Sequence, residues 1–222
     1  EMTSSLVGSE MCIRDSHKIM HQLMVDGVDI PCTDGVMIAD TVQIGTGTTI
    51  LPGTILLGNT TIGKDCLIGP NTYIMDGTVG NGVTLDNVKL TDSTVEDGAD
   101  AGPFVQIRGG SVLHTGVHIG DFVEVKNSTV GAGTKSAHLT YIGDSDVGAG
   151  VNFGCGTVTV NYDGKNKRRC KIGDGAFIGC NTNLVAPVEV GDRAYIAAGS
   201  TITDDIPGDA LSIARARQVN KP

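Results

Sequence analysis

The chain has 222 residues, a formal net charge of −9, and 32 glycines but no tryptophan. Hydrophobic residues make up 40% of it, which is too many for a disordered chain, and no apolar run is long enough for a transmembrane helix. The acidic balance makes nucleic acid a poor partner. The six cysteines lack zinc-type spacing and no signal peptide is visible, so we expect free thiols and a cytoplasmic protein.

The start of the chain does not match the pattern of the rest. Residues 1–16 resemble translated adapter sequence, and we exclude them from the fold. The following stretch, "HKIMHQLMV", predicts a short helix with Ile19, Leu23 and Met24 on one face. His17 and His21 lie four residues apart on this helix, but no third ligand completes a metal site, which favours a solvated face.

A six-residue repeat dominates the chain from residue 38 to residue 207. This period fits neither a helix nor a flat sheet, but it fits a strand and a corner repeated three times per coil of a parallel β-helix. At roughly 18 residues per coil, we expect nine to ten coils. The first and fifth positions of each hexad should point inward. The fifth positions of the first hexads are Val42, Thr48, Thr54, Thr60, Cys66, Thr72 and Thr78.

The aliphatic first positions fall into three series along the chain. They are Ile38, Ile44, Ile50, Leu56, Ile62, Ile68 and Ile74; then Val95, Ala101, Ile107, Leu113, Ile119, Val125, Val130, Ser136, Ile142, Val147, Phe153 and Thr159; and finally Ile172, Ile178, Leu184, Val190, Ile196 and Ile202. The pattern resembles that of the hexapeptide-repeat acyltransferases. This resemblance implies a left-handed β-helix and a homotrimer with active sites between subunits. A purely structural solenoid is the alternative.

Stacking of the hexads predicts one outward column of residues with steps of about 4.8 Å. The column runs from an acid and a histidine to small side chains, which suits a groove for an extended ligand. Its members are Asp121, His138, Cys155, Cys180 and Ala198. Imidazole titrates near neutral pH, so His138 is the candidate general acid or base. Cys155 or Cys180 as a covalent nucleophile is the rival interpretation.

The neighbouring face carries two cations, Arg108 and Lys126, at the same position of successive coils. Stacked cations repel each other unless an anion lies between them, and either a bound phosphate or Glu124 would satisfy them. Tyr141 lies at the corner that faces this pair. We therefore expect a phosphate site, the Tyr141 hydroxyl and His138 to converge on one corner.

The basic segment "NYDGKNKRRCK" interrupts the repeat. Loops inserted into a solenoid commonly bind ligands, so this segment is either a binding loop or a solvated hairpin. His114 and His118 lie close in sequence, but no third histidine aligns with them, and we expect no metal site.

Four motifs, "IGDFVEVK", "KSAHLTYIGD", "VNFGCGTVTVNYDGKNK" and "IAAGS", make the resemblance specific. They resemble the acetyltransferase half of the bifunctional N-acetylglucosamine-1-phosphate uridyltransferase/glucosamine-1-phosphate N-acetyltransferase family, over about residues 17–222. The resemblance implies acetyl transfer from acetyl-CoA to glucosamine 1-phosphate, with His138 as the base. It implies that the sugar phosphate is held by Arg108, Lys126, Tyr141 and Asn152, with Lys167 reaching in from a neighbouring subunit. It implies acetyl-CoA contacts from Cys155, Asn161, Tyr162, Cys180, Ala198 and Arg215.

The chain departs from this family in three ways. Positions 155 and 180 are commonly Ala and Ser in relatives, whereas both are Cys here. From the resemblance we expect residues 17–37 to be a helical linker left from an N-terminal nucleotidyltransferase domain outside this sequence, and we expect neither uridyltransferase activity nor its Mg²⁺ from these residues. The tail, residues 208–222, is shorter than usual. Another amino sugar as acceptor, or a non-catalytic trimeric scaffold, stays an alternative function.

Overall fold

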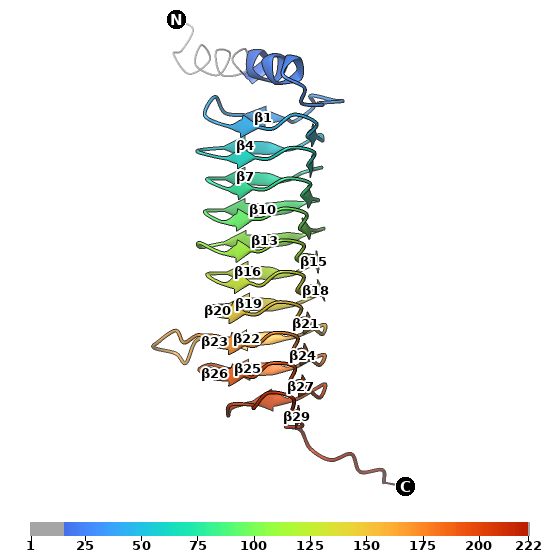
Figure 1. The fold of residues 1–222 in the computed structure, drawn as a ribbon, viewed down its shortest axis with the longest axis vertical. Coiled ribbons are helices and arrows are strands. Elements are labelled where there is room, and N and C mark those ends of the chain that lie inside the picture. The colour runs from blue at the N-terminus through green and yellow to red at the C-terminus, as the bar shows by residue number, and fades with distance from the viewer. Residues whose placement is uncertain (1–15, 222) are drawn as a thin grey trace, which may run out of the picture.

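The computed structural model describes residues 16–221, so Cys12 and nearly all of the segment excluded above lie outside the described residues. Residues 16–25 are helical, and the chain then winds through stacked coils of short strands, as Figure 1 shows. Every strand pairs in parallel with the strand one coil away, and the three strands of a coil belong to three separate sheets. The predicted parallel β-helix is confirmed, while its left-handed sense stays a prediction.

The three sheets are named here in the order in which the chain first enters them. Sheet 1 contains β1 (Met37–Ile38), β4 (Ile55–Leu57), β7 (Tyr73–Met75), β10 (Val88–Thr91), β13 (Val105–Arg108), β16 (Glu124–Lys126), β19 (Tyr141–Gly143), β22 (Val158–Val160), β25 (Asn183–Val185) and β28 (Thr201–Ile202). Sheet 2 contains β2 (Gln43–Ile44), β5 (Thr61–Ile62), β8 (Thr78–Val79), β11 (Thr94–Val95), β14 (Val112–Leu113), β17 (Thr129–Val130), β20 (Ser145–Val147), β23 (Cys170–Ile172) and β26 (Val188–Val190). Sheet 3 contains β3 (Thr49–Ile50), β6 (Leu67–Ile68), β9 (Thr84–Leu85), β12 (Asp100–Ala101), β15 (His118–Asp121), β18 (Lys135–His138), β21 (Asn152–Phe153), β24 (Phe177–Ile178), β27 (Tyr195–Ile196) and β29 (Leu211–Ser212).

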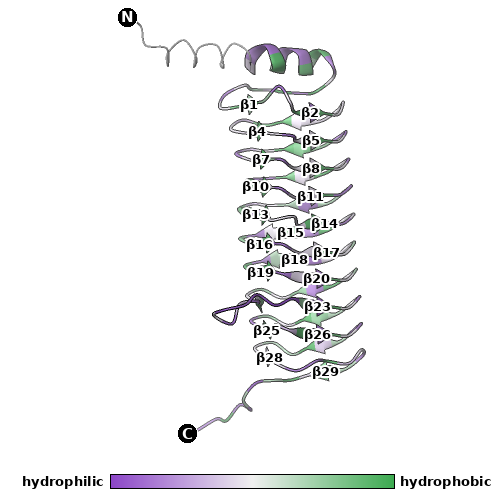
Figure 2. Cartoon of the chain, turned by 90° about the vertical axis from the view of Figure 1, so that its left-hand side faces the viewer, coloured by the Kyte–Doolittle hydropathy of each residue, from purple (hydrophilic) through white to green (hydrophobic). Residues whose placement is uncertain are grey.

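The first-position side chains form a large part of the core and stack in rows inside the solenoid. All of those predicted to point inward are buried except Ile44, which is half-buried. Figure 2 shows hydrophobic residues recurring along the stacked strands. Each side chain packs on its counterpart one coil away, because parallel pairing in register brings like positions together.

One hexad position that was predicted to point inward does not do so. Thr78 is exposed, because a five-residue step at this point moves the inward places to Gly77 and Val79. A Cβ atom at Gly77 would lie 2.7 Å from the Ile74 side chain, so the interior has no room for more than hydrogen there. On the helix, Met24 is exposed and Met20 is buried in its place.

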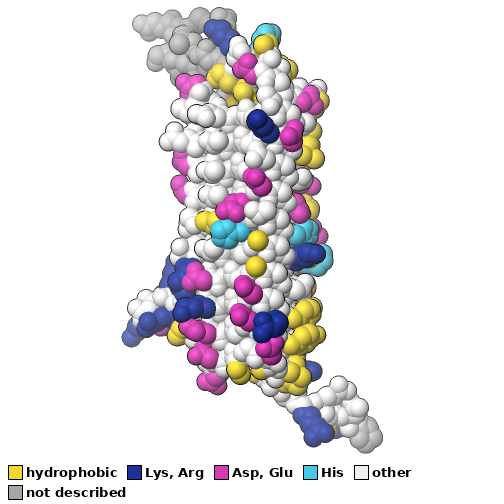
Figure 3. All heavy atoms as spheres, viewed as in Figure 1, with side chains coloured by type: hydrophobic (Ala, Val, Ile, Leu, Met, Phe, Trp, Pro, Cys, Tyr) yellow, Lys and Arg dark blue, Asp and Glu magenta, His cyan; other side chains and the backbone are white. Residues whose placement is uncertain are grey.

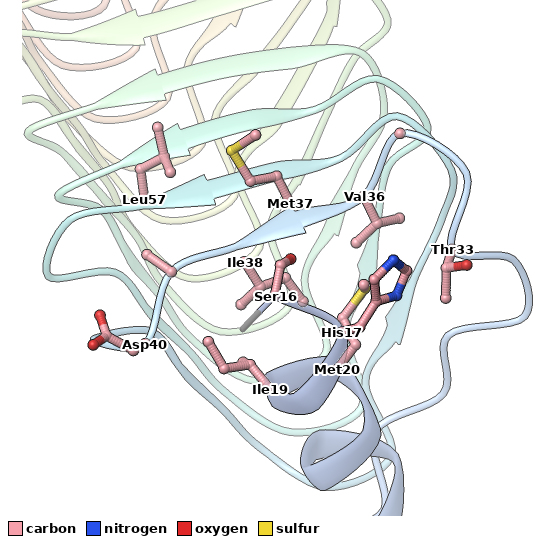
Figure 4. Close-up of a pocket in the computed structure, with 12 residues that line it drawn as sticks. Ser16, His17, Ile19, Met20, Thr33, Val36, Met37, Ile38, Asp40 and Leu57 are labelled. Carbon is pink, nitrogen blue, oxygen red and sulfur yellow. The ribbon is translucent and has the colours of Figure 1, made fainter. Parts of the chain in front are cut away.

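The helix covers the first coil, with Ile19 and Leu23 packed against the core beside Met20. A cavity of about 540 Å³ remains between the helix and this coil. Figure 4 shows Val36 and Ile38 in its wall, opposite the helix. Its lining is mostly apolar and contains none of the predicted site residues, so we do not regard it as the candidate site.

The other end of the molecule and the inserted loop complete the fold. β29 lies within residues 208–222, the stretch expected to be a tail, and pairs with β27. The basic insertion lies between β22 and β23, where Tyr162 and Lys167 form an antiparallel bridge. In Figure 1 this loop projects from the side of the solenoid.

Candidate functional site

The outward column predicted from the hexads is confirmed by the strand register. Asp121 pairs directly with His138. His138, Cys155, Cys180 and Ala198 each lie two residues after a core residue. These core residues pair from coil to coil: Ser136 with Phe153, Phe153 with Ile178, and Ile178 with Ile196. These registers place Cys155, Cys180 and Ala198 below His138 at one residue per coil.

His138 ends β18 and presents its imidazole to solvent, with 61% of the side chain exposed. Its Nδ1 atom lies 3.9 Å from Oδ2 of Asp121. This separation is too long for a hydrogen bond, but it is short enough for the carboxylate to stabilise an imidazolium. The Nε2 atom is the ring nitrogen that does not face Asp121.

The two stacked cations are in register, since Arg108 of β13 pairs with Lys126 of β16. Arg108 donates from Nε and Nη2 to Oε1 of Glu124, at 2.8 and 2.6 Å. Nζ of Lys126 lies 3.4 Å from Oδ2 of Asp144. Glu124 therefore neutralises Arg108, as the alternative allowed, whereas Lys126 has a partner that sequence reasoning missed.

Asp144 is a nearly buried carboxylate, with 4% of its side chain exposed. The side-chain amides of Asn127 and Asn161 both donate to it. Burial acts to raise the pKa of Asp144, but these hydrogen bonds and Lys126 outweigh it, so that the pKa lies below its ordinary value. The carboxylate is therefore ionised at neutral pH. One signal could have revealed it, because Asn127, Asp144 and Asn161 recur with the spacing of the His138 column.

Lys167 of the inserted loop lies beside Lys126 of the same chain. The pKa of Lys167 is lowered, chiefly by its contact with the Lys126 ammonium and then by that group's charge. Burial acts to lower the pKa of Lys126, but the negative charge of Asp144 and its contact with the ammonium raise it overall. Arg108 also acts on Lys167 electrostatically. Figure 3 shows Lys and Arg side chains gathered around this loop. The resulting group of three cations faces two carboxylates, Glu124 and Asp144, and its excess positive charge suits an anion.

His138 and the cationic group belong to two different sheets of the chain, and their convergence on one corner stays a prediction. His138 ends a strand of sheet 3, whereas Lys126 is the last residue of β16 in sheet 1 and pairs with Gly143. Tyr141, the first residue of β19, connects the two places. Its ring lies over Gly143, and its hydroxyl accepts a hydrogen bond of 3.3 Å from Asn161.

The remaining predicted residues occupy separate places. Asn152 lies on sheet 3, paired with Lys135 and Phe177. Tyr162 is exposed in the loop and donates to the Gly164 carbonyl at 2.8 Å.

Asn161 and Arg215, both predicted to contact acetyl-CoA, differ in their relation to the column. Asn161 belongs to the group around Asp144 and not to the column. The Arg215 side chain lies near Gly199, the residue after Ala198 and thus close to the far end of the column.

The described thiols are free, as expected, and two of the histidines are paired with carboxylates. Cys155 and Cys180 are free, as are Cys32, Cys66 and Cys170. His114 and His118 each face one carboxylate, of Glu96 and Asp100 respectively. Among residues 16–221, no three His, Cys, Asp or Glu side chains gather as a metal site. None of these residues form a helix long and apolar enough to cross a membrane.

Comparison with known proteins found two family models that match parts of the repeat. A family model described as "Bacterial transferase hexapeptide (six repeats)" matches residues 169–204, and one described as "Hexapeptide repeat of succinyl-transferase" matches residues 59–87. A putative acetyltransferase of solved structure, from Desulfovibrio desulfuricans G20, is 14% identical with a TM-score of 0.45, and the match covers 79% of this chain and 56% of that one.

Curated relatives match nearly the whole chain. The bifunctional protein GlmU of Geobacillus sp. (strain WCH70) is 53% identical over 220 residues, which are 97% of this chain and 48% of that protein. GlmU of Clostridium kluyveri is 49% identical over the same share of each chain. The chain thus spans about half the length of these relatives.

Proposed function

We propose that this chain, which carries the bacterial transferase hexapeptide repeat and is similar over nearly its whole length to half of the bifunctional protein GlmU, is an acetyltransferase. It moves the acetyl group of acetyl-CoA to the amine of glucosamine 1-phosphate. The product, N-acetylglucosamine 1-phosphate, would serve the synthesis of UDP-N-acetylglucosamine. Residues 38–207 would form the catalytic domain, with residues 17–37 as a linker and residues 208–222 as a tail.

The observation that carries this proposal is that a column headed by an acid and a histidine and a group of cations are present on neighbouring faces of the solenoid. His138 stands above a line of small side chains at the corner of the solenoid, and Asp121 lies directly next to it. Lys126 and Lys167 lie on the next face, with the Tyr141 ring extending toward them. A base and a site for a charged phosphate are the two features that a phosphorylated amino sugar requires.

The chemistry begins with the substrate amine, which is an ammonium at neutral pH and cannot attack a thioester in that form. Nε2 of His138 accepts a proton from it, since Nδ1 faces Asp121. The free amine attacks the thioester carbonyl carbon and the carbon–sulfur bond breaks. The nitrogen gives up its second proton to the departing thiolate, so coenzyme A is released as the thiol, and His138 later returns its own proton to solvent. Asp121 stabilises the imidazolium that results.

Acetyl-CoA would lie along the column below His138. Cys155, Cys180 and Ala198 are small, so a ligand can run close to the backbone there. Arg215, near the end of the column, is a suitable partner for the phosphates of the coenzyme. Asn161 and Tyr162 lie away from the column in the same chain, and would reach acetyl-CoA only if it is bound between subunits.

We therefore also propose a homotrimer with its active sites between subunits. His138 and the cations lie on different faces of a narrow solenoid, and a single face offers only a shallow groove. Asn152 lies on sheet 3, apart from the sugar-phosphate contacts predicted on sheet 1, and would then contribute to a site shared with a neighbouring copy. The free thiols fit the cytoplasmic location expected from the sequence.

The experiment that tests the proposal measures thiol release from acetyl-CoA in the presence of glucosamine 1-phosphate. We expect release that depends on the sugar phosphate, and competition with other amino sugars would establish the acceptor. Absence of release with any amino sugar, in a folded protein, would support the alternative of a non-catalytic scaffold.

A further inference from the structure

Gly143 lies in the candidate site at a position where the backbone conformation does not require a glycine. Gly143 is buried at the end of β19 and does not have a positive φ, so its conformation is open to other residues. It pairs with Lys126 and belongs to an outward row of sheet 1 in which it is the only glycine. The row consists of Leu57, Met75, Thr91, Arg108, Lys126, Gly143, Val160 and Val185.

The space that a side chain would occupy at this position is filled by Tyr141. A Cβ atom at Gly143 would lie 2.3 Å from the Tyr141 hydroxyl oxygen, 2.4 Å from Cζ and 2.5 Å from Cε1. Carbon atoms in proteins do not approach so closely without displacement. The phenol ring therefore lies where the missing side chain of Gly143 would stand.

This placement directs the hydroxyl of Tyr141 toward the cationic group. Tyr141 begins β19, near the corner that carries His138, while Asn161 and Lys126 lie toward the far end of the strand. By lying along the strand, the ring brings its hydroxyl within 3.3 Å of the Asn161 amide. Any larger residue at position 143 would push the hydroxyl away from this group.

We propose that Gly143 is a positioning residue, which keeps the Tyr141 ring across sheet 1 so that its hydroxyl contacts the phosphate of the acceptor. This inference deepens the proposed function and rests on it. Tyr141 touches the substrate, and Gly143 acts only through Tyr141.

A double-mutant cycle tests the inference, using Gly143→Ala alone, Tyr141→Ala alone, and both together. We expect Gly143→Ala to raise KM for glucosamine 1-phosphate about tenfold, the size of one lost hydrogen bond, and to leave KM for acetyl-CoA within about twofold. In the Tyr141→Ala background the same substitution should change neither constant. An equal rise in both backgrounds, or no rise in either, would overturn the inference.

Thermal unfolding of the same variants provides a readout that does not depend on catalysis. Gly143→Ala should lower Tm when the ring is present and have little effect when it is absent. If Gly143→Ala fails to fold and the double variant folds, the contact with the ring is supported; if neither folds while Tyr141→Ala does, it is refuted. A wild-type protein that transfers no acetyl group would contradict the proposed function, whereas the coupling in Tm would still report on the contact.

Discussion

His138 is the residue on which the proposed chemistry depends. Its exposed imidazole follows Asp121 in the column, so we expect His138→Ala to lower kcat by roughly 10²–10⁴ while acetyl-CoA still binds. Steady-state kinetics and calorimetric titration with acetyl-CoA measure the two effects.

Cys155→Ala is the matched control, because Cys155 lies one coil below His138 in the same column. It should retain most of the activity if the acetyl group passes directly to the amine. An inactive Cys155 variant, together with an acetylated thiol trapped in the wild type, would instead make Cys155 the nucleophile.

Lys126 is expected to serve phosphate binding more than acetyl-CoA binding. Lys126→Ala should weaken the affinity for glucosamine 1-phosphate by about 1.5–3 kcal/mol, the contribution of a charge-assisted hydrogen bond. Titration with each substrate separates the effects, and acetyl-CoA affinity should hardly change. The variant also leaves the Asp144 carboxylate with one partner fewer, so equal losses for both substrates would indicate that Lys126 mainly serves to hold the local structure.

The pH dependence of stability should report on Asp144. Its pKa is lower in the folded chain than in the unfolded chain, so its contribution to stability is complete above its ordinary pKa of about 3.9 and is lost as the pH falls below that. Asp144→Asn should therefore unfold at a lower urea concentration than the wild type at pH 7, and the difference should shrink below about pH 4. A difference that stays constant over this range would contradict the assigned role.

At the scale of elements, the inserted loop is held to the solenoid by Arg169. Its guanidinium donates to the carbonyls of Asn127 and Ser145, at 3.0 and 3.1 Å, and pairs with Asp146. Lys167 lies two residues earlier in the loop, so this attachment places its ammonium beside Lys126.

Arg169→Ala should therefore loosen the loop and raise KM for glucosamine 1-phosphate about two- to fivefold, since exposed ion pairs contribute modestly. Kinetics and limited proteolysis within residues 163–168 measure the change. Arg193→Ala is the control, because Arg193 pairs with Asp209 and not with the loop. A similar effect of both substitutions would argue against a specific attachment.

The whole solenoid should be active only as a trimer. The predicted acetyl-CoA contacts are divided between the column and the group around Asn161, which lie on different faces of one chain. We expect sedimentation to show three chains, with activity falling on dilution in step with dissociation. A stable monomer with full activity would refute the shared site.

The repeat by itself determined the inner rows and the outward column. Parallel strands in register stack equivalent positions, so a regular spacing along the chain becomes a contact between coils. This reasoning correctly predicted that His138 lies next to Asp121 and that nearly all first positions are buried. It was wrong at Thr78, where one shorter step changed which residue faces inward.

Only the tertiary structure decided how the side chains of the site are paired. From the sequence, Glu124 was a possible partner of both Arg108 and Lys126. In the structure it pairs with Arg108, whereas Lys126 pairs with Asp144. The approach of Lys167 depends on how a non-repetitive loop folds back, and the direction of Tyr141 depends on the space left at Gly143. Period specifies where each Cα atom lies in the solenoid, but the direction of a side chain is chosen by packing and charge in three dimensions, which no spacing along the chain records.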